Sequence, residues 1–217
     1  MKGYIYQDDC RSCFLNDLFI QNNYEMVSDV NDADFIFVGK DNQRIIKEKI
    51  NFTLIRDDLG ICINDNQSFR KDNNYLTVLA LINLLIQNHH LPICTKVLIL
   101  GYGDLAKRII KLLNNLNNEI TVVNRNNKNH LEIIEHYHHQ DINNINYDYN
   151  FIFNTIPDNY LDSSKFTNQI IYDLAGKLET KYSNYYNYKA LPNDYYPSYS
   201  ALLIFKVMKD VLNNVEK

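Results

Sequence analysis

"KVLILGYGDLAKRIIKLLNNL", Lys96–Leu116, joins an apolar run to an amphipathic run through a turn that contains two glycines. Val97–Leu100 has the composition of a buried strand, and residues 104–114 have helical spacing. Gly101, Gly103 and Ala106 follow the pattern Gly-x-Gly-x-x-Ala. The first glycine permits a tight turn, the second lets backbone approach a pyrophosphate, and the third position needs a small residue. The stretch therefore predicts a dinucleotide-binding turn.

This turn supplies the first set of candidate cofactor-binding residues. The pyrophosphate would lie over the start of the helix, where unpaired N–H groups and the helix dipole favour anions. The chain has only six glycines and two are in this turn, which makes a chance match a poor explanation. The alternative is a Rossmann-shaped domain that binds no ligand. The candidate residues are Gly101, Tyr102, Gly103, Asp104, Leu105 and Ala106.

The end of the next strand bears on the choice between NAD and NADP. Sites for NAD usually place an Asp or Glu there, to bind the ribose hydroxyls. Asn124 and Arg125 stand there instead, after "EITVV". A carboxylate repels a 2′-phosphate, whereas a guanidinium binds it through paired hydrogen bonds. We therefore predict NADP as the cofactor, in preference to NAD.

Two later strand ends complete the predicted cofactor site. "NFIFNTIP" and "QIIYDLAG" both have the pattern of strands in the same sheet, and ligands of open α/β sheets bind beyond the carboxyl ends of strands. At the first strand end, an Asx or proline turn without a role in cofactor binding is an equal alternative. At the second, the equal alternative is a strand end that has no such role. The candidate residues are Asn154, Thr155, Ile156, Pro157, Leu174 and Ala175.

The rest of the chain also alternates between strand and helix patterns, which predicts two α/β units around a cleft, the second a doubly wound parallel sheet. The predicted boundaries are a small α/β domain at 1–72, a crossing helix at 73–92, a Rossmann domain at 93–195 and a helix at 196–217 that returns to the first domain. Within them we expect helices at 42–50 and 129–139, and a short strand or turn at 189–193.

Composition limits the classes of function. The net charge of −4, with scattered Lys and Arg, argues against a nucleic-acid partner and against a basic membrane-binding patch. No apolar run reaches membrane-spanning length, and the acidic residues near the start do not fit a signal peptide, so we expect a cytoplasmic protein. Four cysteines make no disulfide framework. We interpret Cys10 and Cys13, an isolated C-x-x-C, as two thiols at the start of a helix, with a redox pair or half a zinc site as the alternatives.

Several motifs occur in an order that resembles the A subunit of dipicolinate synthase. They are "LIRDDLGICIN", the apolar helix, "KVLILGYGDLAKRI", "FIFNTIP", "IIYDLAG" and "ALPNDYYPSYSALLI". The resemblance covers about residues 50–215 well and residues 1–50 in outline. "TVVNRN" is also similar to the NADP-binding strand of shikimate dehydrogenases and glutamyl-tRNA reductases.

The family resemblance implies NADP-dependent dehydrogenation of dihydrodipicolinate to dipicolinate, a spore metabolite, together with a flavoprotein-like second subunit. It implies that Asp57 and Asp58 face the cleft. By their position they end the last predicted strand of the first half, just before the crossing helix, where one could act as a base or orient a substrate ammonium or hydroxyl. A helix cap or a solvated turn is the alternative interpretation. The chain departs from the family by its shorter first domain and by offering only Arg56, Lys177 and Lys189 as cations near the predicted cleft. The alternative function is therefore a non-catalytic protein that binds or senses NADP(H), or the cofactor-holding subunit of a complex.

Tyrosines cluster in residues 182–199. They can line the cleft, stack on nicotinamide or form the surface of a homodimer, since aromatic residues are enriched at interface cores. A strand-rich segment in a protein encoded by an AT-rich genome is a further interpretation.

Overall fold

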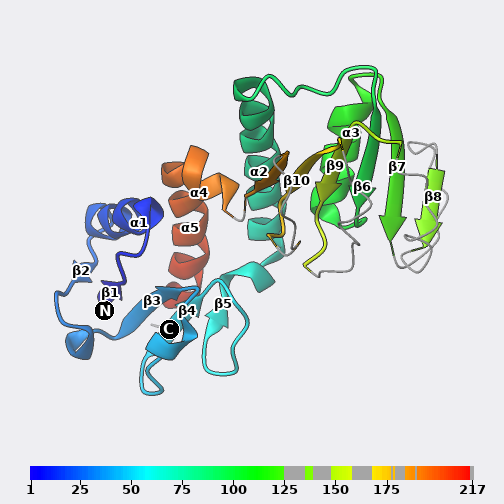
Figure 1. Cartoon of the computed structure of the whole chain (residues 1–217). Coiled ribbons are helices and arrows are strands. Elements are labelled where there is room, and N and C mark those ends of the chain that lie inside the picture. The colour runs from blue at the N-terminus through cyan, green and yellow to red at the C-terminus, as the bar shows by residue number, and fades with distance from the viewer. Residues whose placement is uncertain are drawn as a thin grey trace. The chain divides into compact units, whose positions relative to one another are not determined.

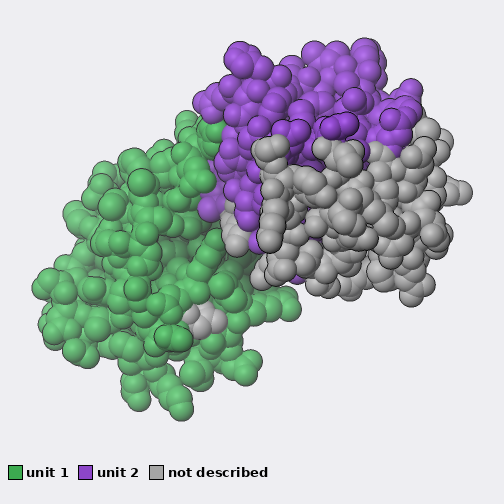
Figure 2. Space-filling view, viewed as in Figure 1, with its two compact units in different colours: residues 1–76, 192–217 green, residues 77–191 purple. Residues whose placement is uncertain are grey.

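The computed structural model describes residues 1–124, 135–138, 148–157, 168–176, 178, 184–188 and 190–215. They form two compact α/β units, shown in Figures 1 and 2. Unit 1 comprises Met1–Leu76 and Pro192–Lys217, and unit 2 comprises Thr77–Leu191. Each unit contains one sheet whose described strand pairs are all parallel. The α/β fold class predicted from the sequence is confirmed.

The sheet of unit 1 has the order β2-β1-β3-β4-β5 among the described strands. Its central strand β3 is buried at Phe35–Val38, as expected of a parallel strand covered on both faces. The elements of the unit's first segment are β1 (Lys2–Ile5), α1 (Cys10–Gln21), β2 (Glu25–Met26), η1 (Val30–Asp32), β3 (Phe35–Gly39), η2 (Asn42–Arg44), β4 (Ile50–Thr53), β5 (Ile61–Cys62) and η3 (Ile63–Asp65).

The C-terminal helix α5 (Pro197–Val215) belongs to unit 1, and Figure 1 shows it beside α1. The ring of Phe19 on α1 meets that of Phe205 on α5 edge-on, with centroids 4.8 Å apart. Pro197 is the first residue of the helix, a position where its missing N–H costs nothing. The short helix α4 (Leu191–Tyr195) precedes it, where a strand or turn was expected.

The helix predicted at 42–50 is wrong. The segment contains only the short 3-10 helix η2, and Ile50 already belongs to β4. The cause is Asn51, whose side chain is buried and bonds the backbone of this segment. Its Nδ2 donates to the carbonyls of Ile46 and Lys49, both at 2.8 Å, and its Oδ1 accepts from the N–H of Ile46 at 3.1 Å. These bonds replace the partners that a helix would supply.

The sheet of unit 2 has the order β11-β10-β9-β6-β7-β8 among the described strands. Read from β8, this is the order 3-2-1-4-5-6 of the Rossmann fold, with its switch point between β6 and β9. The elements are α2 (Gln67–Gln87), which begins in unit 1, β6 (Lys96–Leu100), α3 (Asp104–Asn114), β7 (Glu119–Asn124), β8 (Glu135–His138), β9 (Phe151–Asn154), β10 (Ile170–Asp173) and β11 (Tyr185–Asn187).

The helix predicted at 129–139 is wrong where the structure describes it, because residues 135–138 form the edge strand β8. It pairs in parallel with β7, with Thr121 opposite Glu135 and Asn124 opposite His138. The backbone N–H and C=O groups of β7 that face β8 are thereby paired. The helical spacing of apolar residues within 129–139 could not indicate this pairing.

An aromatic row covers one face of this sheet. The ring of Tyr172 stacks on Phe153 at 5.7 Å and on Tyr186 at 5.1 Å. The Tyr172 hydroxyl contacts Nδ1 of His90 at 3.0 Å and accepts from Nδ2 of Asn88 at 3.2 Å. Part of the tyrosine-rich segment thus forms the strand β11 and packs within unit 2. None of the helices described here has the length and apolarity needed to cross a membrane.

Candidate functional site

The candidate site is the edge of the unit 2 sheet at which four parallel strands end together. Leu100 of β6 is opposite Asn154 of β9 and Val123 of β7, and Asn154 is opposite Asp173 of β10. The residues that follow these positions therefore share one edge, at the switch point between β6 and β9. This is where ligands bind in open α/β sheets.

Gly101 makes the tight turn at this edge. Its φ is +102°, a conformation that L side chains rarely adopt, and its N–H donates to the carbonyl of Val123 at 2.8 Å. A Cβ at this position would lie 2.4 Å from Oγ1 of Thr155 and 3.0 Å from Cγ1 of Ile156. Glycine is required here because the loop after β9 passes directly against the turn.

Gly103 has a different environment, since a Cβ built there would meet no heavy atom within 4 Å. Its backbone is extended, at φ −78° and ψ −176°, so any residue could adopt it. It is the N-cap of α3, and no side-chain hydrogen bond caps the helix there. The first N–H groups of an uncapped helix need partners from outside the helix. The open space beside Gly103 and these N–H groups fit the pyrophosphate of a dinucleotide.

Ala106 is the third constrained position of the pattern, and the residues between the constrained positions differ in exposure. Ala106 is fully buried, so the first turn of α3 packs closely on the sheet. Asp104 is exposed, whereas Tyr102 and Leu105 are half-buried. Nζ of Lys107 lies 5.1 Å from the centre of the Tyr102 ring, a cation–π contact on the outer side of the helix.

Asn154 and Thr155 use their side chains within the loop. The Asn154 Nδ2 donates to the Ile156 carbonyl at 3.1 Å and to Oδ1 of Asp173 at 2.8 Å, while its Oδ1 accepts from the Ile156 N–H at 3.0 Å. The Thr155 hydroxyl donates to the Leu100 carbonyl at 2.8 Å. This is the Asx turn that the sequence left as an alternative, with Pro157 following it. Both amide protons of Asn154 and the hydroxyl proton of Thr155 are engaged, so these side chains shape the edge.

Asp173, at the end of β10, organises the next loop, a role that the sequence analysis did not assign to it. Its buried carboxylate also accepts from the N–H groups of Ala175 at 3.1 Å, Gly176 at 2.8 Å and Leu178 at 2.8 Å, and from the Tyr185 hydroxyl at 2.8 Å. Burial and the hydrogen bond to Asp173 raise the pKa of Tyr185 above its ordinary value. The signal in the sequence was an Asp at a strand end with a glycine, Gly176, three residues later.

The loop that Asp173 organises carries two of the predicted cofactor positions. Leu174 and Ala175 are half-buried, and the N–H of Leu174 donates to the Asn154 carbonyl at 2.9 Å. The exits of β9 and β10 are therefore bonded to one another.

Asn124 ends β7 at the same edge. Its Oδ1 atom is buried and has no hydrogen-bond partner among the described residues. A buried acceptor without a donor is costly, and a ligand hydroxyl can satisfy it. Arg125, the predicted 2′-phosphate ligand, lies outside the described residues.

Asp57 and Asp58, the predicted catalytic residues, belong to unit 1 and lie in the connection between β4 and β5. They do not follow the last strand of the first half, because β5 comes after them. Oδ1 of Asp57 accepts from the N–H of Leu59 at 2.9 Å, which closes a turn, and Asp58 is exposed. Arg56 beside them forms an exposed ion pair with Asp65 at 2.8 Å. Lys177 and Lys189 lie outside the described residues.

Comparison with known proteins gives matches in structure. No protein-family model matches the sequence, and a search of curated proteins finds no match. The structure is similar to the A subunit of dipicolinate synthase from Bacillus halodurans, with a TM-score of 0.78, 13% identity and 97% of each chain covered. It is similar to the same subunit from Bacillus subtilis, with a TM-score of 0.75, 16% identity, and coverage of 100% of this chain and 97% of that one.

An L-alanine dehydrogenase matches more distantly, with a TM-score of 0.64, 11% identity, and coverage of 98% of this chain and 90% of that one. At these identities a match shows the fold and does not transfer an activity. The chain therefore has the fold of the A subunit of dipicolinate synthase and of other Rossmann dehydrogenases, which confirms the resemblance indicated by the order of its sequence motifs.

Proposed function

We propose that the protein is an NADP-dependent oxidoreductase that acts on a small carboxylated metabolite, similar in activity to the A subunit of dipicolinate synthase. The observation that carries this proposal is the turn Gly101–Ala106, at the switch point of a Rossmann-ordered sheet. Its open space at Gly103 and its uncapped helix start are features that a dinucleotide site needs and that a purely structural turn does not.

Different residues of unit 2 would bind different parts of the cofactor. The N–H groups at the start of α3 would bind the pyrophosphate, and the buried Oδ1 of Asn124 would accept a hydrogen bond from the adenosine ribose. Arg125 would bind the 2′-phosphate and select NADP. The bonded exits of β9 and β10, at residues 154–157 and 174–175, would form the wall beside the nicotinamide. The nicotinamide supplies the hydride chemistry, and the protein orients the partners.

The substrate side of the proposal involves unit 1. Asp57 or Asp58 would accept a proton from the substrate, since a general base must be a side chain within hydrogen-bond reach of that proton. A substrate with carboxylates also needs cations. Arg56, Lys177 and Lys189 are the proposed partners, which makes them the residues to vary when the substrate is sought.

The ion pair between Arg56 and Asp65 favours a second candidate function. Because this guanidinium is already bound to a carboxylate, it is less available to a dicarboxylate substrate. The alternative is a protein that binds NADP(H) without catalysis, as a sensor or as the cofactor-holding subunit of a complex.

Turnover separates the two functions. The protein is incubated with dihydrodipicolinate and NADP⁺, alone and with a flavoprotein-like second subunit, and the reduced nicotinamide is followed by its absorbance. The proposal expects formation of NADPH that depends on substrate and is lost in a variant with both Asp57 and Asp58 changed to Asn. NADP binding without reduction under either condition would support the non-catalytic alternative.

A further inference from the structure

The first turn of α1 in unit 1 carries two thiols that the proposed function does not use. Cys10 is the first residue of the helix and Cys13 is the fourth. Both are exposed and both are free thiols. Cys62 is half-buried, and Cys94 is exposed in the connection before β6.

The spacing of Cys10 and Cys13 suits a disulfide bond. Three residues of an α-helix advance about 4.5 Å along the axis and turn about 300°, which places the two Cα atoms about 5 Å apart. Disulfides usually join Cα atoms about 4.4–6.8 Å apart. The two side chains also lie on the same face of the helix. A bond between them therefore needs rotation of the side chains and no unwinding of the helix.

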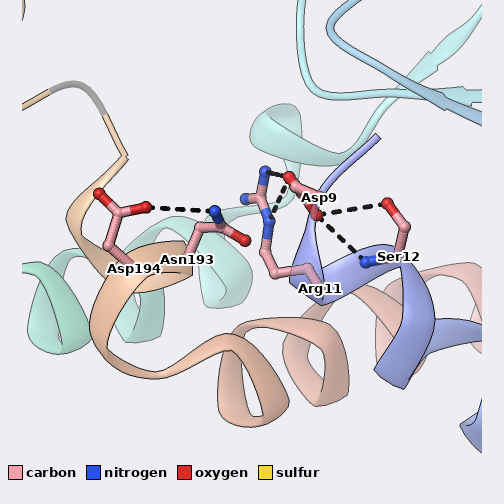
Figure 3. Close-up of polar contacts among 5 residues, drawn as sticks. All are labelled: Asp9, Arg11, Ser12, Asn193 and Asp194. Carbon is pink, nitrogen blue, oxygen red and sulfur yellow. Dashed lines mark hydrogen bonds and ion pairs between the residues drawn. The ribbon is translucent and has the colours of Figure 1, made fainter. Parts of the chain in front are cut away.

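The backbone of this turn is held in place by its cap, shown in Figure 3. Asp9 is the N-cap, and its Oδ1 accepts from the N–H of Ser12 at 3.1 Å and from its hydroxyl at 3.3 Å. Oδ2 of Asp9 accepts from Nε and Nη2 of Arg11, at 3.1 and 2.6 Å. Ser12 is buried, so the turn is anchored through the residue that points inward while both thiols stay accessible.

The surroundings favour thiol chemistry over a metal site. Among the described residues, no three His, Cys, Asp or Glu side chains are grouped so that they could hold a metal ion. α1 joins β1 to β2, and these two strands pair in parallel, with Gly3 opposite Met26. A C-x-x-C beside such a βαβ unit is an arrangement typical of reversible thiol–disulfide exchange.

We propose that Cys10 and Cys13 form a dithiol site that exchanges reversibly with low-molecular-weight disulfides. One thiolate attacks a disulfide RS–SR, forms a mixed disulfide and releases RS⁻. The second thiol then loses its proton and attacks the protein sulfur of the mixed disulfide. The Cys10–Cys13 bond forms and the second RS⁻ leaves. The protein loses two electrons and two protons, and RS–SR is reduced to two RSH.

The test uses the full chain, reduced, desalted and incubated with oxidised glutathione. Intact mass and peptide mapping then report the state of each cysteine. We expect an internal Cys10–Cys13 bond, seen as the loss of two hydrogens, with no glutathione on either residue and full reversal by dithiothreitol. Cys94 is the internal control, because an exposed thiol without such a neighbour should keep its glutathione.

Single variants separate the two steps. In Cys13→Ser the glutathione adduct should persist on Cys10, and in Cys10→Ser it should persist on Cys13, because the resolving thiol is absent. Melting curves of both variants check that the fold is kept. A stable adduct on Cys10 or Cys13 in the unsubstituted protein would overturn the proposal. So would an intermolecular bond through either residue, or reaction at Cys94 with none at the pair.

Discussion

Changing Gly103 to Ala should weaken dinucleotide binding and leave the fold intact. The new methyl group meets no protein atom within 4 Å, and the extended backbone tolerates alanine. Removing a glycine where the backbone permits it stabilises a protein by about 0.4–1 kcal/mol. If a pyrophosphate lies against this backbone, the same methyl occupies its space. Overpacking of this kind costs about 1–3 kcal/mol, which corresponds to about 5- to 150-fold in the dissociation constant.

Gly101→Ala is the matched control because this substitution, in the same turn, should lower the stability of the fold. At φ +102° an alanine is strained by about 1–3 kcal/mol. Its Cβ would also displace the Thr155 hydroxyl from the Leu100 carbonyl, a loss of about 1 kcal/mol. The variant should therefore lose about 2–4 kcal/mol of unfolding free energy.

Two measurements on both variants test this reasoning. Thermal melting without ligand should separate them, with Gly101→Ala melting lower and Gly103→Ala close to the unsubstituted protein. Calorimetric titration with NADPH should then show weaker binding by Gly103→Ala. Binding of NADPH by Gly103→Ala at unchanged affinity would refute the placement of the pyrophosphate on this turn.

Three further outcomes are expected. Arg125→Ala should weaken the binding of NADPH more than the binding of NADH, as measured by calorimetry. An equal loss of affinity for both nucleotides would contradict the assignment of Arg125 to the 2′-phosphate. The pKa of Tyr185 is raised in the folded protein, so its neutral hydroxyl stabilises the fold. This stabilisation is fully present below about pH 10, the pKa of a tyrosine in the unfolded chain, and is lost as the pH rises further. Tyr185→Phe should therefore lower stability by about 1.5–3 kcal/mol at neutral pH, through the lost hydrogen bond to Asp173, and flatten the alkaline fall in denaturant melts. Burial opposes ionisation of Asp9, but its bonds to Arg11 and Ser12 hold its pKa below the ordinary range. Asp9→Ala should cost about 0.5–2 kcal/mol near neutral pH, a difference that shrinks as the pH falls below about 4; a constant difference would contradict the role of the charge.

The sequence predicted the glycine turn well because its signals are local. Gly101 and Gly103 stand between a fully apolar strand and an amphipathic helix, and each part constrains the others. The structure adds that glycine is needed at the two positions for different reasons. At Gly101 a side chain would collide with the loop after β9, whereas at Gly103 a Cβ would meet no protein atom within 4 Å. That difference depends on Thr155, which is distant in the sequence.

The errors came from segments whose structure is decided by distant partners. Residues 42–50 have apolar spacing that suits a helix, but the segment is too short to be a stable helix alone, and Asn51 bonds its backbone instead. Residues 135–138 form a strand because β7 offers a free edge. The role of Asp173 was missed for a related reason, since its bonds to Asn154 and Tyr185 join three parts of the chain.

The central claim, that unit 2 binds a phosphorylated nicotinamide dinucleotide, is tested most directly by thermal-shift titration with NADPH, NADP⁺, NADH and NAD⁺ at matched concentrations. A ligand present at about 100 times its dissociation constant adds about 2.7 kcal/mol to the stability of the folded state. The account predicts a clear rise in melting temperature with NADPH and NADP⁺, and a smaller rise or none with NADH and NAD⁺. Melting curves that none of the four nucleotides changes would contradict it.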